Sequence, residues 1–189
     1  MPTDAVAGPL PATLTTLASS AAAAFDAAGN SDWAASSTAL QAAKTAWDTY
    51  RAGPVSARLA TQLNDALAAL EETIGAEDSL EARQAAVDLG RAVLDFHLRH
   101  RPTADVDRNR FEQWARQVLV DAENDDLGGV RGDSTLLDVT LDRFAHTLSA
   151  ANAAAVEAQL AALATAAKAG NLSAATAAAE ALLNTLGGM

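Results

Sequence analysis

Apolar residues recur along most of the chain at helical spacing, and short polar turns interrupt them. This pattern predicts eight helices, near residues 12–28, 33–51, 55–75, 80–100, 104–123, 128–149, 150–169 and 172–186. Pro11, Pro54 and Pro102 stand near three of the starts, where the missing N–H of proline costs little. Because short turns make neighbouring helices antiparallel, we expect an all-α fold of antiparallel helical hairpins that form one or two up-down bundles.

The polar turns indicate an internal repeat of about four units, each of roughly 47 residues. A residue of the type that caps helix N-termini recurs at this interval, in the order Asp32, Ser79, Asp126 and Asn171. Side-chain oxygens of these residues accept hydrogen bonds from the free N–H groups at a helix start, so we expect all four to be N-caps. A large apolar residue follows each of them.

We expect residues 1–11 to form a flexible N-terminal stub and residues 12–189 to form the bundle, with possible halves at 12–101 and 102–189. The stub is rich in Pro, Ala and Thr and lacks the charged and apolar regions of a signal peptide. Such a stretch is typical of the segment that follows a removed export signal or lipid anchor, although an ordinary flexible terminus explains it as well.

Glycines interrupt the helix expected from residue 128, which opens with the sequence LGGVRGDS. A glycine inside a helix costs up to about 1 kcal/mol relative to alanine. Either this helix begins late, near Asp133, or Gly128, Gly129 and Gly132 permit close packing of the backbone. The last 41 residues, from Ser149, contain little besides Ala, Leu, Asn and Thr, which predicts a hairpin with a poorly specified core or a partner-facing element.

Composition narrows the class of protein further. Hydrophobic residues make up 50% of the chain and aromatic residues only 4%, so the core must be built from small side chains on closely spaced helices. The net charge of −11 disfavours nucleic acid and anionic membrane surfaces as partners. Cysteine is absent, which excludes disulfides and thiolate metal sites. No apolar run reaches the length of about 18 residues that predicts a transmembrane segment.

One segment carries a family resemblance. Residues 95–134 read DFHLRHRPTADVDRNRFEQWARQVLVDAENDDLGGVRGDS, which resembles a segment of uncharacterised exported bacterial proteins of alanine-rich type. The resemblance covers about a fifth of the chain; it implies export and no particular activity. With the N-terminal stub, it favours the mature domain of an exported protein or lipoprotein over a cytoplasmic protein. The GN turn near residue 170 is similar to a tetratricopeptide turn, but the repeat length does not fit that family.

The candidates for a metal or haem site are the three histidines and one carboxylate, namely His97, His100, His146 and Asp142. Residues three or four apart lie on one side of a helix, which pairs His97 with His100 and Asp142 with His146. Imidazole with carboxylate suits zinc, copper, nickel or iron. The paired-helix Glu-x-x-His pattern of di-iron bundles is missing, and ordinary surface ion pairs also explain these residues. We therefore predict no cofactor, with a divalent metal as the alternative.

A basic patch is the candidate for an anion or partner site. It consists of Arg99, Arg101, Arg108 and Arg110 around the junction of two helices in an otherwise acidic chain. The helix dipole alone explains basic residues at a helix C-terminus and acidic residues at the next N-terminus. The functional interpretation is a cluster that grips a phosphate or a partner's carboxylates.

No catalytic motif supports an enzyme, because GxSxG, the P-loop and cysteine are all missing. The acidic loop at 121–129 departs from a calcium loop at the required glycine and glutamate, and the RGD at 131–133 is too short to be specific. The sequence favours a non-enzymatic helical module that binds a protein partner or ligand, with no nucleic acid as partner. The alternatives are a metal- or haem-binding bundle and a purely structural or oligomerising protein.

Overall fold

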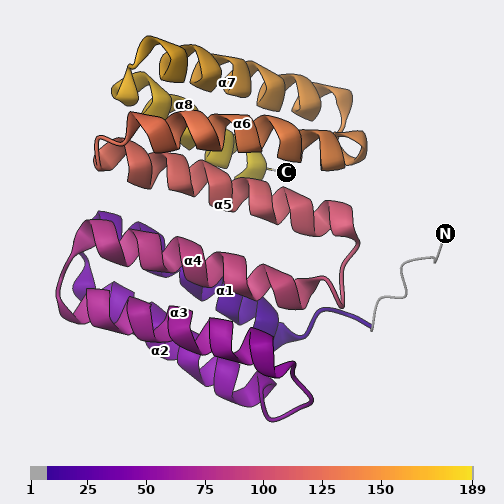
Figure 1. Ribbon diagram of the computed structural model, residues 1–189. Coiled ribbons are helices and arrows are strands. Elements are labelled where there is room, and N and C mark those ends of the chain that lie inside the picture. Colours follow the sequence, from indigo (N-terminus) through magenta and orange to yellow (C-terminus); the bar gives the residue numbers. More distant parts are fainter. Residues whose placement is uncertain (1–7, 189) are drawn as a thin grey trace. The chain divides into compact units, whose positions relative to one another are not determined.

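The computed structural model describes residues 8–188, and that part of the chain contains eight α-helices, one 3-10 turn and no strand (Figure 1). The predicted all-α fold of antiparallel helices is therefore confirmed. Most of the predicted stub, residues 1–7, lies outside the described residues. The elements are α1 (Ala12–Gly29), α2 (Trp33–Tyr50), α3 (Ala57–Gly75), α4 (Ser79–His97), α5 (Thr103–Glu123), α6 (Leu127–Phe144), η1 (Ala145–Thr147), α7 (Ala150–Ala169) and α8 (Leu172–Gly187).

Two helices end earlier than the periodicity predicts. Helix α4 stops at His97 rather than near residue 100, and α6 stops at Phe144 rather than near residue 149. After α6, the chain makes one 3-10 turn and then becomes extended at Leu148. Ser149 follows with an extended backbone, and its hydroxyl accepts from the N–H of Asn152 at 3.2 Å. Ser149 therefore belongs to the start of α7 as its N-cap, not to the end of α6.

The chain divides into two compact units, unit 1 (Met1–Pro102) and unit 2 (Thr103–Met189). This division lies one residue after the boundary at 101/102 that was considered from the sequence. In unit 1, α1 packs against α2 and α4, and α3 packs against α4 and more lightly against α2. In unit 2, α5 packs against α6 and α8, and α7 packs against α8 and more lightly against α6. Each unit is thus an up-down bundle in which the last helix returns to the first.

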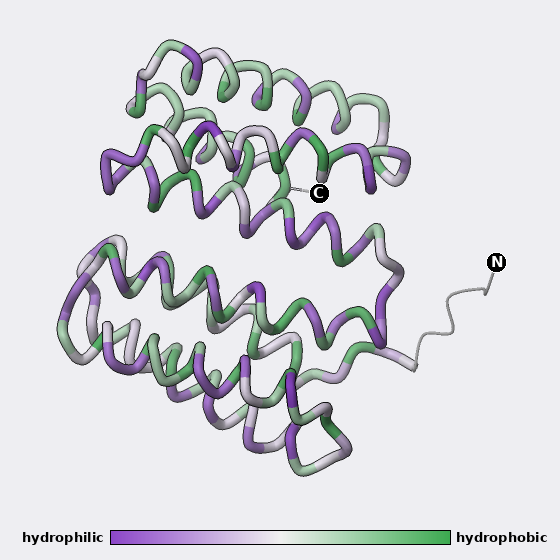
Figure 2. The backbone as a smooth tube through the Cα atoms, in the orientation of Figure 1, coloured by the Kyte–Doolittle hydropathy of each residue, from purple (hydrophilic) through white to green (hydrophobic). Residues whose placement is uncertain are grey.

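Few large side chains fill the two cores. In unit 1, the ring of Phe96 lies 5.6 Å from both Trp47 and Tyr50, and the indole N–H of Trp47 donates to Asn64 at 2.7 Å. In unit 2, Phe111 meets Phe144 edge to face at 5.5 Å. Leucine and alanine supply most of the remaining core. Figure 2 shows the hydropathy of each residue along the chain. Helix α7 is pale green over most of its length, because alanine dominates its sequence.

The four hairpin turns share one backbone geometry. In each turn, the residue before the N-cap is left-handed, with φ of 55° at Ser31, 54° at Glu77, 55° at Asp125 and 69° at Gly170. The N–H of the next residue then donates to a carbonyl five positions back, as Asp32 does to Ala27 at 2.9 Å. This is the Schellman arrangement, which satisfies the carbonyls left free at a helix C-terminus. The N-cap residue therefore has two roles, because its backbone N–H closes the preceding helix and its side chain caps the next one.

The structure corrects one of the four predicted caps. Asp32, Asp126 and Asn171 are N-caps as predicted. At the second turn, the cap is Asp78, whose carboxylate accepts from the N–H of Glu81 at 3.1 Å, and Ser79 is already helical. The Ser79 hydroxyl instead donates to the carbonyl of Ala28 at 2.8 Å, which ties the start of α4 to the end of α1.

We expect Glu77→Gly to raise the free energy of unfolding by about 1 kcal/mol. The left-handed conformation costs an L-residue roughly 1–2 kcal/mol, which exceeds the entropy cost of roughly 0.5–1 kcal/mol that glycine adds. Urea unfolding followed by circular dichroism would measure the change. Gly170→Ala, at the equivalent position of another turn, should lower stability by about the same amount. Equal stability of wild type and both variants would contradict the role given to these residues.

Candidate functional site

His97 is a packing residue at the end of α4. Its side chain is almost fully buried, and Nε2 lies 3.5 Å from the carbonyl oxygen of Leu14 on α1. Burial lowers the pKa of His97; the Leu14 carbonyl acts in the opposite direction, and the charges of Arg101 and His100 lower the pKa further. Nδ1 has no hydrogen-bond partner among the described residues. The ring is therefore held neutral, with Nε2–H suited to donate to Leu14.

We expect the free energy of unfolding to fall as the pH drops through and below about 6.5, the ordinary pKa of histidine, partly because of His97. Its pKa is lower in the folded protein than in the unfolded chain, so the unfolded state binds more protons in this range. The stability that neutral His97 contributes is full above the unfolded pKa, near 6.5. It is lost as the pH falls from there through the folded pKa. Urea unfolding at a series of pH values would measure the slope.

His97→Gln should flatten this pH dependence, because glutamine does not titrate. The matched control is His146→Gln, the same substitution at an exposed histidine, which shows whether the loss of any histidine would flatten the slope. An identical slope in wild type and His97→Gln would rule out His97 as its source.

The structure divides the predicted metal ligands between the units. His97 and the half-buried His100 belong to unit 1, whereas His146 and Asp142 are exposed in η1 and α6 of unit 2. Within residues 8–188, no group of three or more His, Cys, Asp or Glu side chains is placed to hold a metal ion. The proposal of a metal or haem site therefore rests on the sequence alone.

The four arginines of the predicted basic patch also divide, two to each unit. Arg99 and Arg101 are exposed just after α4, and Nη1 of Arg99 lies 3.5 Å from the carbonyl oxygen of Pro54. On α5, Arg110 forms an ion pair at 3.1 Å with the buried Asp107. Arg108 lies one turn before Glu112. Burial raises the pKa of Glu112, and the charges of Arg116 and Arg108 offset part of that rise. Carboxylates of the same helix thus offset part of the positive charge on α5.

The glycines at the start of α6 lie inside the helix, because α6 begins at Leu127 and not near Asp133. A Cβ atom at Gly129 would overlap the carboxylate of Asp121, which accepts from the Gln117 amide at 2.8 Å. An alanine at this position would therefore force the Asp121 side chain to move. At Gly132, a Cβ atom would have no neighbour within 4 Å. The acidic loop is the turn between α5 and α6, and the RGD tripeptide lies within α6.

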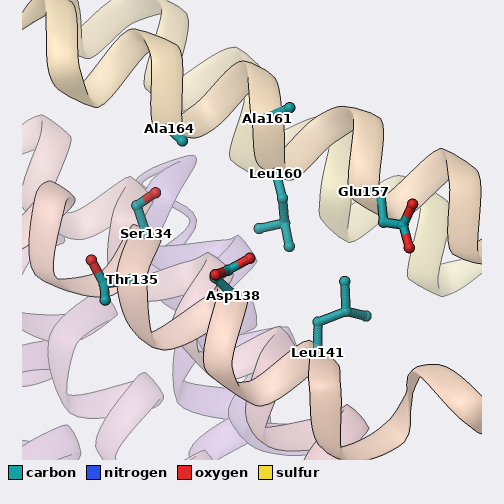
Figure 3. Close-up of a pocket in the computed structure, with 8 residues that line it drawn as sticks. All are labelled: Ser134, Thr135, Asp138, Leu141, Glu157, Leu160, Ala161 and Ala164. Carbon is teal, nitrogen blue, oxygen red and sulfur yellow. The ribbon is translucent and has the colours of Figure 1, made fainter.

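Unit 2 contains a groove between α6 and α7, with a volume of about 360 Å³ (Figure 3). In this view, Leu141 and Asp138 on α6 and Leu160 and Glu157 on α7 extend toward the space between the two helices. The α6–α7 groove is lined by Ser134, Thr135, Asp138, Leu141, Glu157, Leu160, Ala161 and Ala164.

The groove follows from the light packing of α7 against α6. Helix α7 presents the small side chains of Ala161 and Ala164 to this space, and these leave room that larger side chains would fill. Asp138 and Glu157 are exposed, and neither forms an ion pair within the described part of the chain. The groove therefore combines an apolar floor with two carboxylates whose charge is not offset by a basic side chain in its lining.

A second groove, of about 500 Å³, lies between α1 and α2 in unit 1. Among the described residues, its lining includes no charged side chain. The hydroxyls of Thr45 and Thr49 donate to carbonyls of their own helix, at 2.9 Å and 3.0 Å, so these groups are already used. This groove offers little chemistry that would select a ligand. Its lining consists of Ala12, Thr13, Thr16, Gln41, Ala42, Thr45, Ala46 and Thr49.

The residues of the α6–α7 groove were not among the sites predicted from the sequence. The available signal was the alanine-rich stretch from Ser149, which indicates weak packing or a partner-facing element but does not identify Asp138 or Glu157.

None of the helices in residues 8–188 has the combined length and apolar character needed to cross a bilayer. No protein-family model matches the chain. No curated protein and no solved structure matches it either.

Proposed function

We propose that this chain is a non-enzymatic helical module that binds a protein partner or ligand through the α6–α7 groove. The observation that carries the proposal is the pairing of an apolar floor with two exposed carboxylates, Asp138 and Glu157, which form no ion pair with any residue in 8–188. Binding sites commonly combine a mostly apolar lining with a few placed polar groups. The missing catalytic motifs favour binding over chemistry, and the resemblance of residues 95–134 favours a role outside the cytoplasm.

Site-specific photocrosslinking in the cell that naturally produces the protein would test this proposal. A photoreactive amino acid at Ala161 should give one discrete adduct, because Ala161 is exposed in the lining of the groove. The matched control is the same amino acid at Ala68, an exposed alanine on α3 of unit 1. Mass spectrometry of the adduct would identify the partner or ligand.

Two outcomes would count against the groove. Either no adduct forms from Ala161, or the same adducts form from Ala161 and Ala68. A further variant separates the groove from the predicted basic patch. If substitution of Arg99, Arg101 and Arg108 abolishes partner binding while Ala164→Trp, which fills the groove, leaves binding intact, the basic patch is the binding surface instead.

A further inference from the structure

The charge of the α6–α7 groove selects for a cation. Asp138 from α6 and Glu157 from α7 face the groove from opposite walls, and its lining contains no Lys or Arg (Figure 3). Arg131, which precedes Thr135 by one turn on α6, is held at the end of α7 because its Nε donates to the carbonyl of Ala167 at 3.1 Å. The net charge of −11 favours the approach of a positively charged partner.

The apolar side chains of the groove select for an occupant with an apolar face. Leu141 and Leu160 form the floor and are each 6% exposed, so a bound group would cover what remains accessible. An isolated ammonium ion would leave this apolar surface in water, whereas an amphipathic segment would cover it.

The shape of the groove favours a helix over other peptide conformations. Its walls run along residues 134–141 of α6 and 157–164 of α7, about 10 Å on each helix at 1.5 Å per residue. Two neighbouring helices form a trough into which the ridge of a third helix packs. A bound strand needs a free sheet edge, but residues 8–188 contain no strand; a polyproline segment needs an aromatic-lined groove, and no aromatic residue lines this one.

We infer that the partner held in the α6–α7 groove is a basic amphipathic helix of another protein. Its apolar residues pack between α6 and α7, and its Lys or Arg side chains reach Asp138 and Glu157. This inference rests on the proposed function, because it names the class of partner for the same groove. Helices of this kind present apolar residues at i, i+3, i+4 and i+7 with basic residues beside them.

The test uses the full chain and a fluorescein-labelled peptide of about 14 residues, composed of leucine and lysine with leucines at helical spacing. Fluorescence anisotropy should detect binding that weakens as salt is added, because the contacts include charge pairs. The double variant Asp138→Lys/Glu157→Lys should bind the peptide at least about tenfold more weakly, since it places like charges against the lysines. Circular dichroism would establish that the variant is folded.

The matched control is Asp65→Lys/Glu180→Lys, which changes the net charge equally at two exposed carboxylates outside the groove lining. An equal loss of binding in this control would overturn the inference, because general charge attraction would then explain it. Equal binding of a lysine-rich peptide without the apolar stripe would also overturn it, in favour of a simple cation site. If the Ala161 adduct forms but the leucine–lysine peptide does not bind, the inference fails and the proposed function stands. Failure of both tests would overturn both.

Discussion

Phe96→Ala is expected to lower the free energy of unfolding by about 3–5 kcal/mol, the largest effect we expect of a single substitution in this protein. Phe96 is 1% exposed, and its ring contacts those of Trp47 and Tyr50. Removing the ring leaves a cavity beside two rigid aromatic side chains. Because most other core positions in unit 1 hold alanine or leucine, few long, flexible side chains are available to fill it.

Urea unfolding followed by far-ultraviolet circular dichroism would measure this loss. Leu98→Ala is the control, since Leu98 is two residues away, 42% exposed and follows the end of α4. It should cost less than about 1 kcal/mol, because exposed apolar side chains contribute little burial. If the two variants lose the same stability, the aromatic cluster is not the centre of the core that its geometry indicates.

The second large effect is expected at the start of α6, where Gly129→Ala should lower the free energy of unfolding by about 1–3 kcal/mol. The new methyl group would overlap the Asp121 carboxylate and push it out of place. That movement breaks the hydrogen bond from Gln117 and withdraws a negative charge from the positive end of the α6 dipole. The gain in helix propensity, at most about 1 kcal/mol, offsets only part of this loss.

Gly132→Ala is the matched comparison on the same helix. It introduces the same methyl group where no atom lies within 4 Å, so only the helix propensity changes. We expect it to raise the free energy of unfolding by about 1 kcal/mol. Urea midpoints of the two variants should therefore move in opposite directions from wild type. A shift of the same sign in both would show that propensity, and not the contact with Asp121, governs this turn.

Local patterns in the sequence predict much of the fold. The starts of α1, α2, α7 and α8 match the predicted positions; Pro11 marks the first of these starts, and the cap residues Asp32 and Asn171 mark those of α2 and α8. The prediction that Ser79, and not the neighbouring Asp78, caps α4 was wrong for a physical reason. Both are good cap residues, and only the backbone geometry of the Schellman turn decides which of them precedes the first helical position.

The α6–α7 groove could not be predicted in the same way. Asp138 and Glu157 lie on different helices, and their relation depends on how closely α7 packs against α6. Alanine permits a range of helix separations, so the sequence of α7 does not determine the width of the space. The contact between His97 and Leu14 was equally hidden, because the two residues lie at opposite ends of unit 1 in the sequence.

The contact between His97 and Leu14 also bears on how such a protein can lengthen during evolution. It brings the first turn of α1 next to the last turn of α4, so the chain enters and leaves this bundle at neighbouring points. When entry and exit are neighbours, a gene duplication can add another copy in series without rerouting the helices already present. Circular permutation is open to such a bundle for the same reason, since a short linker can join the old ends.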